Sequence, residues 1–344
     1  MKARNTPGAS TRRQSGFTMV ELMVAMTLGL LIIGAAVATL VIGRQGFNAV
    51  DSASQLRENS RFAANLIQRI GIQAGYENPN ANYNWKIFCR GGVANCGDAF
   101  NDTNPGIRGF DDAVITNLLA LPGGVTNGDR DASCAVADTS CRNGSDVLMV
   151  RFWGDSRPGA ATGDGSMINC AGIVEREGQV PAYSIFHVVR SVSGEPTLAC
   201  TYRDPATLVW ATVPLVGGVE GFQVLYGVDS VAENAAPALQ DAGTDSVPER
   251  YLRASQVDVP GDAAATADNW RRVRSIRIGL LLRGGANSAV DLATSGRTFA
   301  VLGAGFTSAG DVGSDLLVAA DGRLRQSLVF TVHMRNSQFV VRPS

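Results

Sequence analysis

The longest apolar stretch of the chain lies close to its N-terminus. No charged side chain occurs from Leu22 to Ile42, and Glu21 is the only charge between Gly16 and Arg44. The 21 uncharged residues, if helical, extend about 32 Å, enough to cross a bilayer core of about 30 Å. We therefore expect a membrane-spanning segment at about residues 19–42, with one carboxylate at its edge.

After this span the pattern becomes amphipathic without a break. Phe62, Leu66 and Ile70 recur every four residues, as they would on one face of a helix. No proline interrupts the chain between residues 8 and 78. The pattern predicts one helix over residues 17–75, far longer than a globular domain needs. Its second half would pack on the rest of the chain through one face, leaving polar positions outside.

The remainder of the chain follows the two-residue period of strands. Apolar residues alternate with polar ones over residues 275–283 and 327–335, which predicts two half-buried strands. We expect further strands at 107–110, 113–119, 146–153, 183–192, 197–203, 207–213 and 222–228. Residues 76–145 are rich in Asn, Gly and Asp and predict loops, and residues 231–269 predict an exposed insertion with a short helix at most. A long helix followed by strands alone indicates an α+β fold whose body, residues 76–344, contains an antiparallel sheet.

Residues 1–16 form a basic leader. They contain Lys2, Arg4, Arg12 and Arg13 and no acidic residue. An ordinary signal peptide is cut after its apolar region, whereas the small residue Gly16 precedes the apolar region here. Cleavage after Gly16 would leave the span on the mature protein. The leader charges favour a cytoplasmic N-terminus, and therefore a body in the periplasm.

All six cysteines follow the span, on the side expected to be oxidising. Their spacing contains no C-x-x-C pair, and only two histidines accompany them, so zinc binding is not favoured. The sequence alone leaves several pairings open. We expect the local disulfides Cys89–Cys96, Cys134–Cys141 and Cys170–Cys200.

Charge and motifs exclude several functions. Without the leader, 26 basic and 31 acidic residues remain, a net charge of −5, which does not favour general nucleic-acid binding. The basic run formed by Arg271, Arg272, Arg274 and Arg277 is interpreted as a strand face or as contacts with acidic neighbours. No G-x-S-x-G, P-loop or H-E-x-x-H motif occurs.

The remaining candidates for chemistry are weak. His187 and His333 have no cysteine or serine signature nearby and are interpreted as structural or solvated. Asn127, Asp129 and Asp131 share the spacing that opens a calcium loop, but Ala132 and Asp138 occupy the places of its glycine and its glutamate. We therefore expect that the protein is not an enzyme and has no catalytic residue, no cofactor and no metal site.

The segment from Gly16 to Glu21 resembles the processing site of type IV pilins and the related pseudopilins. The resemblance implies that a membrane peptidase cuts between Gly16 and Phe17 and that Phe17 becomes the methylated N-terminal residue. It also implies that the Glu21 carboxylate pairs with the terminal amine of a neighbouring subunit and sets the register of assembly.

Further segments resemble the PilW group of minor pilins. They are residues 56–63 and 74–76 at the helix end, then 145–148, 219–229, 270–276 and 330–336 in the body. Residues 71–73 depart from the group's pattern, which has a basic residue there. The resemblance implies a minor pilin that primes pilus assembly in or near the tip and supports twitching motility, adhesion or DNA uptake. Its partners would be other minor pilins, the major pilin, the prepilin peptidase and methyltransferase, and the inner-membrane assembly platform.

Other functions remain open at this stage. A J-type pseudopilin of type II secretion shares the leader, the helix and a β-rich body. A tip adhesin would bind a surface through residues 76–145 and 231–269. A periplasmic enzyme on a signal anchor is the least favoured of these.

Overall fold

A computed structural model describes residues 16–77, 105–115, 117–118, 121, 125–127, 143–157, 162–176, 180–237, 246–289, 296–318 and 320–336. Structural statements below refer to these residues. The two expected disulfides Cys89–Cys96 and Cys134–Cys141 lie outside them, as do Asp129, Asp131 and Asp138.

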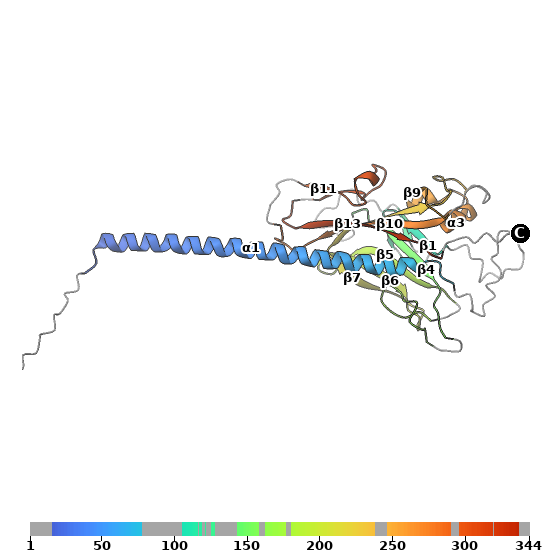
Figure 1. Cartoon of the computed structure of the whole chain (residues 1–344), viewed down its shortest axis with the longest axis horizontal. Helices are drawn as coiled ribbons and strands as arrows, with labels where there is room; N and C mark the ends of the chain where they lie inside the picture. The colour runs from blue at the N-terminus through green and yellow to red at the C-terminus, as the bar shows by residue number, and fades with distance from the viewer. Residues whose placement is uncertain are drawn as a thin grey trace, which may run out of the picture.

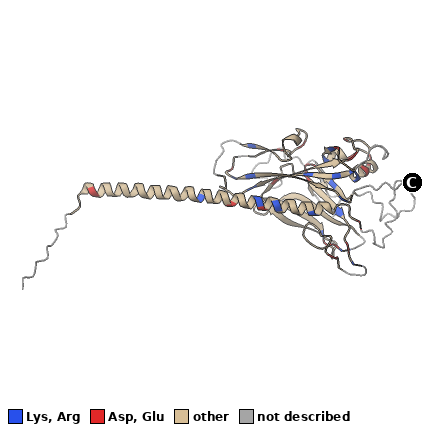
Figure 2. Ribbon diagram, in the orientation of Figure 1, with Lys and Arg blue, Asp and Glu red and all other residues tan. Residues whose placement is uncertain are grey.

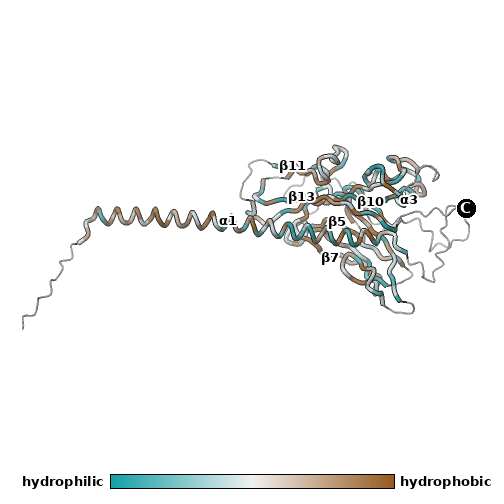
Figure 3. The backbone as a smooth tube through the Cα atoms, viewed as in Figure 1, coloured by the Kyte–Doolittle hydropathy of each residue, from teal (hydrophilic) through white to brown (hydrophobic). Residues whose placement is uncertain are grey.

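One helix dominates the shape of the molecule. Helix α1 spans Met19–Ile72, 54 residues, or about 81 Å at 1.5 Å per residue. Figure 1 shows its N-terminal part standing alone and its C-terminal part lying against the body. Figure 3 shows the free part as predominantly hydrophobic. Within the described residues α1 is the only helix long and apolar enough to cross a membrane. The predicted uninterrupted helix is confirmed, since α1 runs without a break over its 54 residues.

The described strands form two larger antiparallel sheets and two small two-stranded sheets. The five-stranded sheet has the order β1-β4-β5-β6-β7 and the four-stranded sheet the order β13-β10-β8-β9, while β11 pairs with β12 and β2 with β3. The bounds are β1 Ile107–Phe110, β2 Ala113–Ile115, β3 Val125–Asn127, β4 Val147–Phe152, β5 Ala182–Arg190, β6 Pro196–Arg203, β7 Trp210–Gly217, β8 Val219–Val228, β9 Arg250–Leu252, β10 Val273–Arg283, β11 Arg297–Ala300, β12 Asp315–Val318 and β13 Arg325–His333. The α+β class with antiparallel sheets is confirmed.

The C-terminal half of α1 lies between the two larger sheets. It contacts β13 and β10 of one sheet and β7 of the other, as Figure 1 also shows. Ala63, Ile67 and Ile70 are fully buried there and share one apolar core with both sheets. Gly71 faces Val332 of β13 so closely that an added Cβ would lie 3.1 Å from a Val332 methyl carbon. The predicted packing of one helix face is confirmed for Ile70, but the buried face runs through Ala63 and Ile67, and Phe62, which was expected on it, is 53% exposed.

Strand β10 corrects one expectation. The predicted strand forms, with Ile278 opposite Val224 of β8 and Phe330 of β13. The strand is nevertheless buried on both faces. A second small core, in which Leu281 packs with Val301, Leu316 and Val318, covers the face that the sequence predicted to be exposed. Its covering residues come from β12 and from the turn after β11, which the alternation along β10 cannot reveal.

The expectation of an exposed insertion at residues 231–269 is wrong for the part that packs on the body, whereas residues 232–234 and 260–264 are exposed as expected. It contains β9 and two helices, α2 (Ala254–Val257) and α3 (Ala263–Arg271). Asp262 caps α3 by accepting a hydrogen bond from the backbone of Ala265 at 2.9 Å. Trp270 at its end is buried and packs edge-on against Tyr226, with ring centroids 4.7 Å apart. This part of the segment therefore belongs to the packed body. A short 3₁₀ turn, η2 (Ala304–Phe306), follows later in the chain.

Candidate functional site

The start of α1 places Glu21 against its own N-terminus. Thr18 is the N-cap, and its hydroxyl accepts a hydrogen bond from the Glu21 backbone at 3.3 Å. In return the Glu21 Oε2 atom accepts from the Thr18 backbone N–H and from the Thr18 hydroxyl, both at 2.9 Å. This reciprocal capping box satisfies backbone donors that a helix start leaves free. It also turns the carboxylate toward Thr18, the residue directly after Gly16 and Phe17.

Gly16 and Phe17 are both exposed. Phe17 is 89% exposed. A Cβ added to Gly16 would meet no atom within 4 Å. Because the fold leaves room for a larger side chain at position 16, nothing in the described part of the chain requires glycine there. A requirement for Gly16 would therefore have to come from an enzyme that acts on this segment.

The apolar part of α1 is free of unpaired side-chain donors. The hydroxyls of Thr27 and Thr39 donate to backbone carbonyls one turn earlier in the helix, at 2.9 Å to Val24 and 2.7 Å to Ala35. A surface with no unsatisfied hydroxyl can face lipid or another apolar helix without losing a hydrogen bond. Glu21 is therefore the group on this surface that needs a polar partner from outside.

Three separate body segments hold the other end of α1. The Gln73 side chain accepts a hydrogen bond from the Ile168 backbone at 3.0 Å. The Gly75 backbone donates to Arg151 O at 2.9 Å. Asn336 Nδ2 donates to Ile72 O and Ala74 O at 3.1 and 3.2 Å, so a residue after the last strand satisfies carbonyls at the helix end.

Close packing accompanies these hydrogen bonds. A Cβ added to Gly106 would lie 2.4 Å from the Gly75 backbone, and Gly75 itself has φ = 69°. Tyr76 donates its hydroxyl to Asp155 at 2.7 Å. Burial, with the neighbouring Asp155 carboxylate, raises the pKa of Tyr76 to about 12. The helix end is therefore fixed rigidly to the body.

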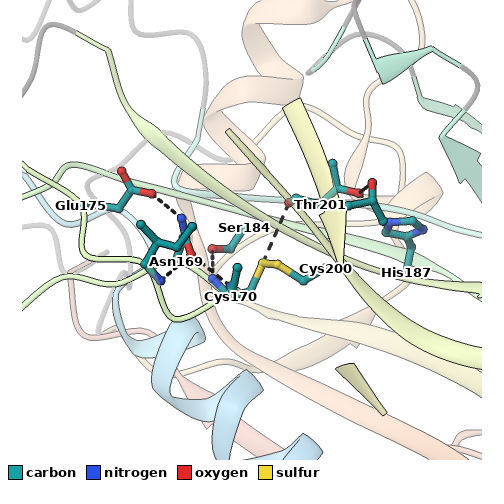
Figure 4. Close-up of a disulfide and its surroundings, with 10 residues drawn as sticks. Asn169, Cys170, Glu175, Ser184, His187, Cys200 and Thr201 are labelled. Carbon is teal, nitrogen blue, oxygen red and sulfur yellow. Dashed lines mark hydrogen bonds between the residues drawn. A yellow bond between two sulfur atoms is a disulfide. The ribbon is translucent and has the colours of Figure 1, made fainter. Parts of the chain in front are cut away.

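The Cys170–Cys200 disulfide, confirmed by the structure, anchors the loop that holds Gln73. It joins this loop to β6, as Figure 4 shows. The Cys170 backbone donates to the Ser184 hydroxyl of β5 at 3.0 Å. Within the loop, Asn169 Oδ1 accepts from the backbones of Ala171 and Ile173 at 3.0 and 3.1 Å. Disulfide and amide together fix the position of the neighbouring Ile168 backbone.

Glu175 is the titratable group of this loop. Its carboxylate accepts from Asn169 Nδ2 at 2.7 Å and is buried. Burial raises the pKa of Glu175 to about 7 from an ordinary value of 4.5, although the Asn169 hydrogen bond opposes the shift. The protonation state of the loop therefore changes near neutral pH.

The two histidines and the basic run noted in the sequence make structural contacts or lie on the surface. His187 Nε2 lies 2.8 Å from the Thr201 hydroxyl in a buried position, and His333 is exposed. Arg274 forms a buried ion pair with Asp229 at 3.1 Å, and Arg271 pairs with Asp268 at 2.6 Å. The interpretation of the basic run as contacts with acidic neighbours holds for these two arginines. Within the described ranges no three His, Cys, Asp or Glu residues form a group that could hold a metal ion.

Sequence reasoning missed the residues that hold the helix end. Gln73 and Asn336 act through hydrogen bonds to backbone atoms far away in the chain, and Asn169 acts through local hydrogen bonds that shape the loop around Ile168. A short amide side chain carries no periodicity that would reveal such a contact. Only Asn336 had a signal, because it closes a segment already noted for its resemblance to the PilW group.

Two regions of the chain match described families. Residues 185–336, from β5 to just beyond β13, match PilW, described as type IV pilus-assembly protein W. Residues 11–37 match the prokaryotic N-terminal methylation motif, which here contains Gly16, Phe17 and Glu21. No curated protein matches the chain significantly.

A type IV-like pilin from Thermus thermophilus is similar among solved structures. It is 16% identical, with a TM-score of 0.29, over 58% of this chain and 81% of that chain. The family assignment rests on the two sequence matches, which fall on the capped start of α1 and on the body that holds its end. These two matches support the assignment of the chain as a type IV pilus minor pilin of the PilW family.

Proposed function

We propose that this chain is a minor pilin that is trimmed between Gly16 and Phe17, methylated at Phe17 and assembled into a pilus through Glu21. The N-terminus would lie in the cytoplasm and the body in the periplasm before assembly. The observation that carries the proposal is the contrast along α1. An exposed apolar half begins with a single carboxylate, and the fold gives that carboxylate no partner but Thr18 among the described residues.

Glu21 would set the register between neighbouring subunits. In this structure its carboxylate already contacts Thr18, the residue next to the proposed new N-terminal residue Phe17. The new amine at Phe17 of a neighbour is a cation of the right kind to pair with it, and a carboxylate in an apolar surrounding needs such a partner. The cost of placing Glu21 at the membrane edge would then last only until a neighbouring amine arrives.

The proposed role at the tip is supported by the match to PilW. With other minor pilins and the inner-membrane assembly platform, the chain would start a pilus in or near its tip, and twitching motility, adhesion or DNA uptake would depend on the assembled fibre. Within residues 231–269, Leu252, Val257 and Thr266 are among the residues buried in the body, so only the exposed remainder of this segment could serve the adhesin alternative. The type II secretion alternative stays open and is decided by the phenotype of a deletion strain.

The test compares three variants of the full chain in cells. Glu21→Ala should be trimmed normally but should be at least tenfold depleted in sheared pili. Thr18→Val removes the cap and keeps the carboxylate. If Glu21 served only to cap α1, both variants would show the same defect, and the proposed register role would be wrong. Asp315→Ala, which removes an exposed carboxylate of the body, should assemble as the wild type does.

Two further measurements complete the test. Gly16 changed to Val should leave the leader attached, because the fold itself tolerates the larger side chain. A band of normal mature size would place the cut elsewhere. A deletion strain should lose surface pili and retain normal protein secretion, and the reverse phenotype would favour the pseudopilin.

A further inference from the structure

A pocket lies beside the turn between β6 and β7, on the face of the five-stranded sheet that does not meet α1. Tyr202 of β6 belongs to the core shared with α1, so its neighbour Arg203 points to the opposite face, as Trp210 of β7 does. The pocket has a volume of about 370 Å³, which is within the range of sites for small ligands. Its described walls are Leu121, Pro181, Tyr183, Arg203, Leu208, Val209 and Trp210.

An aromatic pair forms one wall of this pocket. The rings of Tyr183 and Trp210 are tilted by 52°, with centroids 5.5 Å apart. Tyr183 is buried and Trp210 is half-buried, so Trp210 is the ring of the pair that a ligand can reach. Aromatic side chains favour offset or edge-on contacts with other rings, and such contacts add to the burial of apolar area.

The β6–β7 turn forms the opposite wall and is held rigidly. The Asp204 backbone donates to Val209 O at 2.9 Å, and the Leu208 backbone donates to Asp204 O at 2.8 Å. Leu208 has φ = 58°, a conformation that is uncommon for leucine. Leu208 and Val209 are nevertheless 45% and 59% exposed. An exposed leucine in a strained conformation gains little stability for the fold, and such strain is found at ligand-binding sites.

Arg203 is the only charged residue among the described walls. Its Nε atom donates to Leu208 O at 3.1 Å, which fixes the guanidinium against the turn. The two terminal nitrogens of a guanidinium held in this way can still bind a carboxylate end-on through two parallel hydrogen bonds. The turn therefore positions both the cation and the aliphatic wall.

No described acid neutralises Arg203. It forms no ion pair with a carboxylate in the described ranges. Asp204, its neighbour in the chain, accepts hydrogen bonds from the backbones of Ala206 and Thr207 at 2.9 and 2.7 Å and does not line the pocket. The charge of Arg203 is therefore available to an anion from outside.

We propose that this pocket binds a carboxylate that carries an aromatic ring. The carboxylate lies on the terminal nitrogens of Arg203, and the ring lies between Trp210 and Leu208. The proposal goes beyond the proposed function and does not depend on it, because the pocket contains no residue of α1. It gives the body a binding site of its own, separate from the helix.

Other ligand classes fit these walls less well. A sugar needs several hydrogen-bonding side chains, whereas five of the seven described wall residues are Leu, Pro, Val or Trp. A nucleotide or a polyphosphate needs more than one cation, and Arg203 stands alone among the described walls. An uncharged apolar ligand would leave Arg203 without a partner.

Ligand competition tests the two halves of the proposed ligand. The full chain in detergent micelles is titrated with 4-fluorophenylacetate, and binding is followed by the broadening of the fluorine resonance. We expect a Kd of about 1 mM, in keeping with the small size of the ligand. Phenylacetate should displace the probe, whereas equal concentrations of phenylacetamide or acetate should displace less than a fifth as much. Equal displacement by phenylacetamide, or no saturable binding, would overturn the proposal.

Substitution of the cation tests the position of the carboxylate. Arg203→Gln should weaken binding of the probe at least tenfold, and Arg203→Lys, which keeps the charge but loses the fork, should have an intermediate effect. The control is Arg297→Gln, which removes an exposed arginine of β11 and should leave the Kd unchanged. Unchanged binding by Arg203→Gln, or an equal loss in Arg297→Gln, would show that the probe binds elsewhere or binds the micelle.

A second variant keeps the test decisive if Arg203→Gln fails to fold. Leu208→Gly removes the aliphatic wall, while glycine adopts the positive φ of this position without strain. The variant should therefore fold as the wild type does, which urea unfolding checks, and should bind the probe at least threefold more weakly. Binding as tight as that of the wild type would overturn the placement of the ring against the turn.

Discussion

The two halves of α1 follow opposite rules although they form one helix. Between Met19 and Ile42 nearly every large apolar side chain is exposed, and none of it is buried by the body residues that the structure describes. Figure 2 shows that, apart from Glu21, the charges of α1 gather next to the body. Between Leu56 and Ala74 one face is buried between two sheets, and hydrogen bonds from three segments hold its end. The comparison teaches that the first half is stabilised only by an environment outside the chain, whereas the second is stabilised by the fold itself. An identical substitution should therefore have different effects in the two halves.

The largest expected difference comes from shortening one isoleucine in each half. Ile67→Ala leaves a cavity at a fully buried position and should lower the free energy of unfolding by about 4 kcal/mol. Ile32→Ala removes the same atoms from a side chain that is 70% exposed and should leave the unfolding of the body unchanged. Urea unfolding of the full chain in detergent, followed by tryptophan fluorescence, measures both. Equal shifts would show that the two halves are not energetically separate.

A smaller effect should appear with pH, and only on the body side. The folded state raises the pKa of Glu175 to about 7 from 4.5, so between these values it binds more protons than the unfolded state. The contribution of Glu175 to stability is then complete below about pH 4.5, falls as the pH rises toward about 7, and stays level above it. The expected loss is on the order of 2 kcal/mol.

Glu175→Gln keeps an oxygen that can accept the hydrogen bond from Asn169, and its side chain cannot titrate. It is therefore the matched variant for this prediction. Its unfolding free energy should exceed that of the wild type at pH 8 and approach it at pH 5. The contrary outcome is a wild type whose stability rises from pH 5 to pH 7 and a Glu175→Gln variant that follows the same curve. The pH dependence would then belong to other groups.

The smallest expected effect concerns the end of the helix. Asn336→Ala removes the two hydrogen bonds to Ile72 O and Ala74 O and should cost about 1 kcal/mol. Hydrogen exchange should accelerate in the last turn of α1 and remain unchanged near Leu56. Ser327→Ala, an exposed change on β13, serves as the control. Uniform acceleration along the docked half would mean that Asn336 stabilises the whole interface.

The sequence predicted the features that depend on neighbouring residues. The apolar run and the four-residue spacing of Phe62, Leu66 and Ile70 predicted α1 to within a few residues. Alternation predicted the strand at residues 276–282, and the spacing of cysteines predicted Cys170–Cys200. Each of these signals lies within a short stretch or in a pair of identical residue types.

What escaped prediction depends on contacts between distant segments. The outer face of β10 is covered by residues 301–318, and Leu252 and Val257 of the supposed insertion are buried by packing that their own polar surroundings do not suggest. At the candidate site, the motif indicated Glu21. The Gln73–Ile168 contact joins residues 95 positions apart and has no periodicity to reveal it. Burial of Glu175 is likewise a property of the folded loop.

The three attachments at the end of α1 have a mechanical consequence. Ile168, Arg151 and Asn336 hold the helix from different segments, and packing along Leu56–Ala74 adds to them. A pull on the apolar end acts along the helix axis, so it loads these contacts together in shear and does not peel them off one at a time. The helix would have to slide as a unit past both sheets before the body came free. A subunit built in this way would transmit tension from the exposed apolar half of α1 to its body without local unfolding.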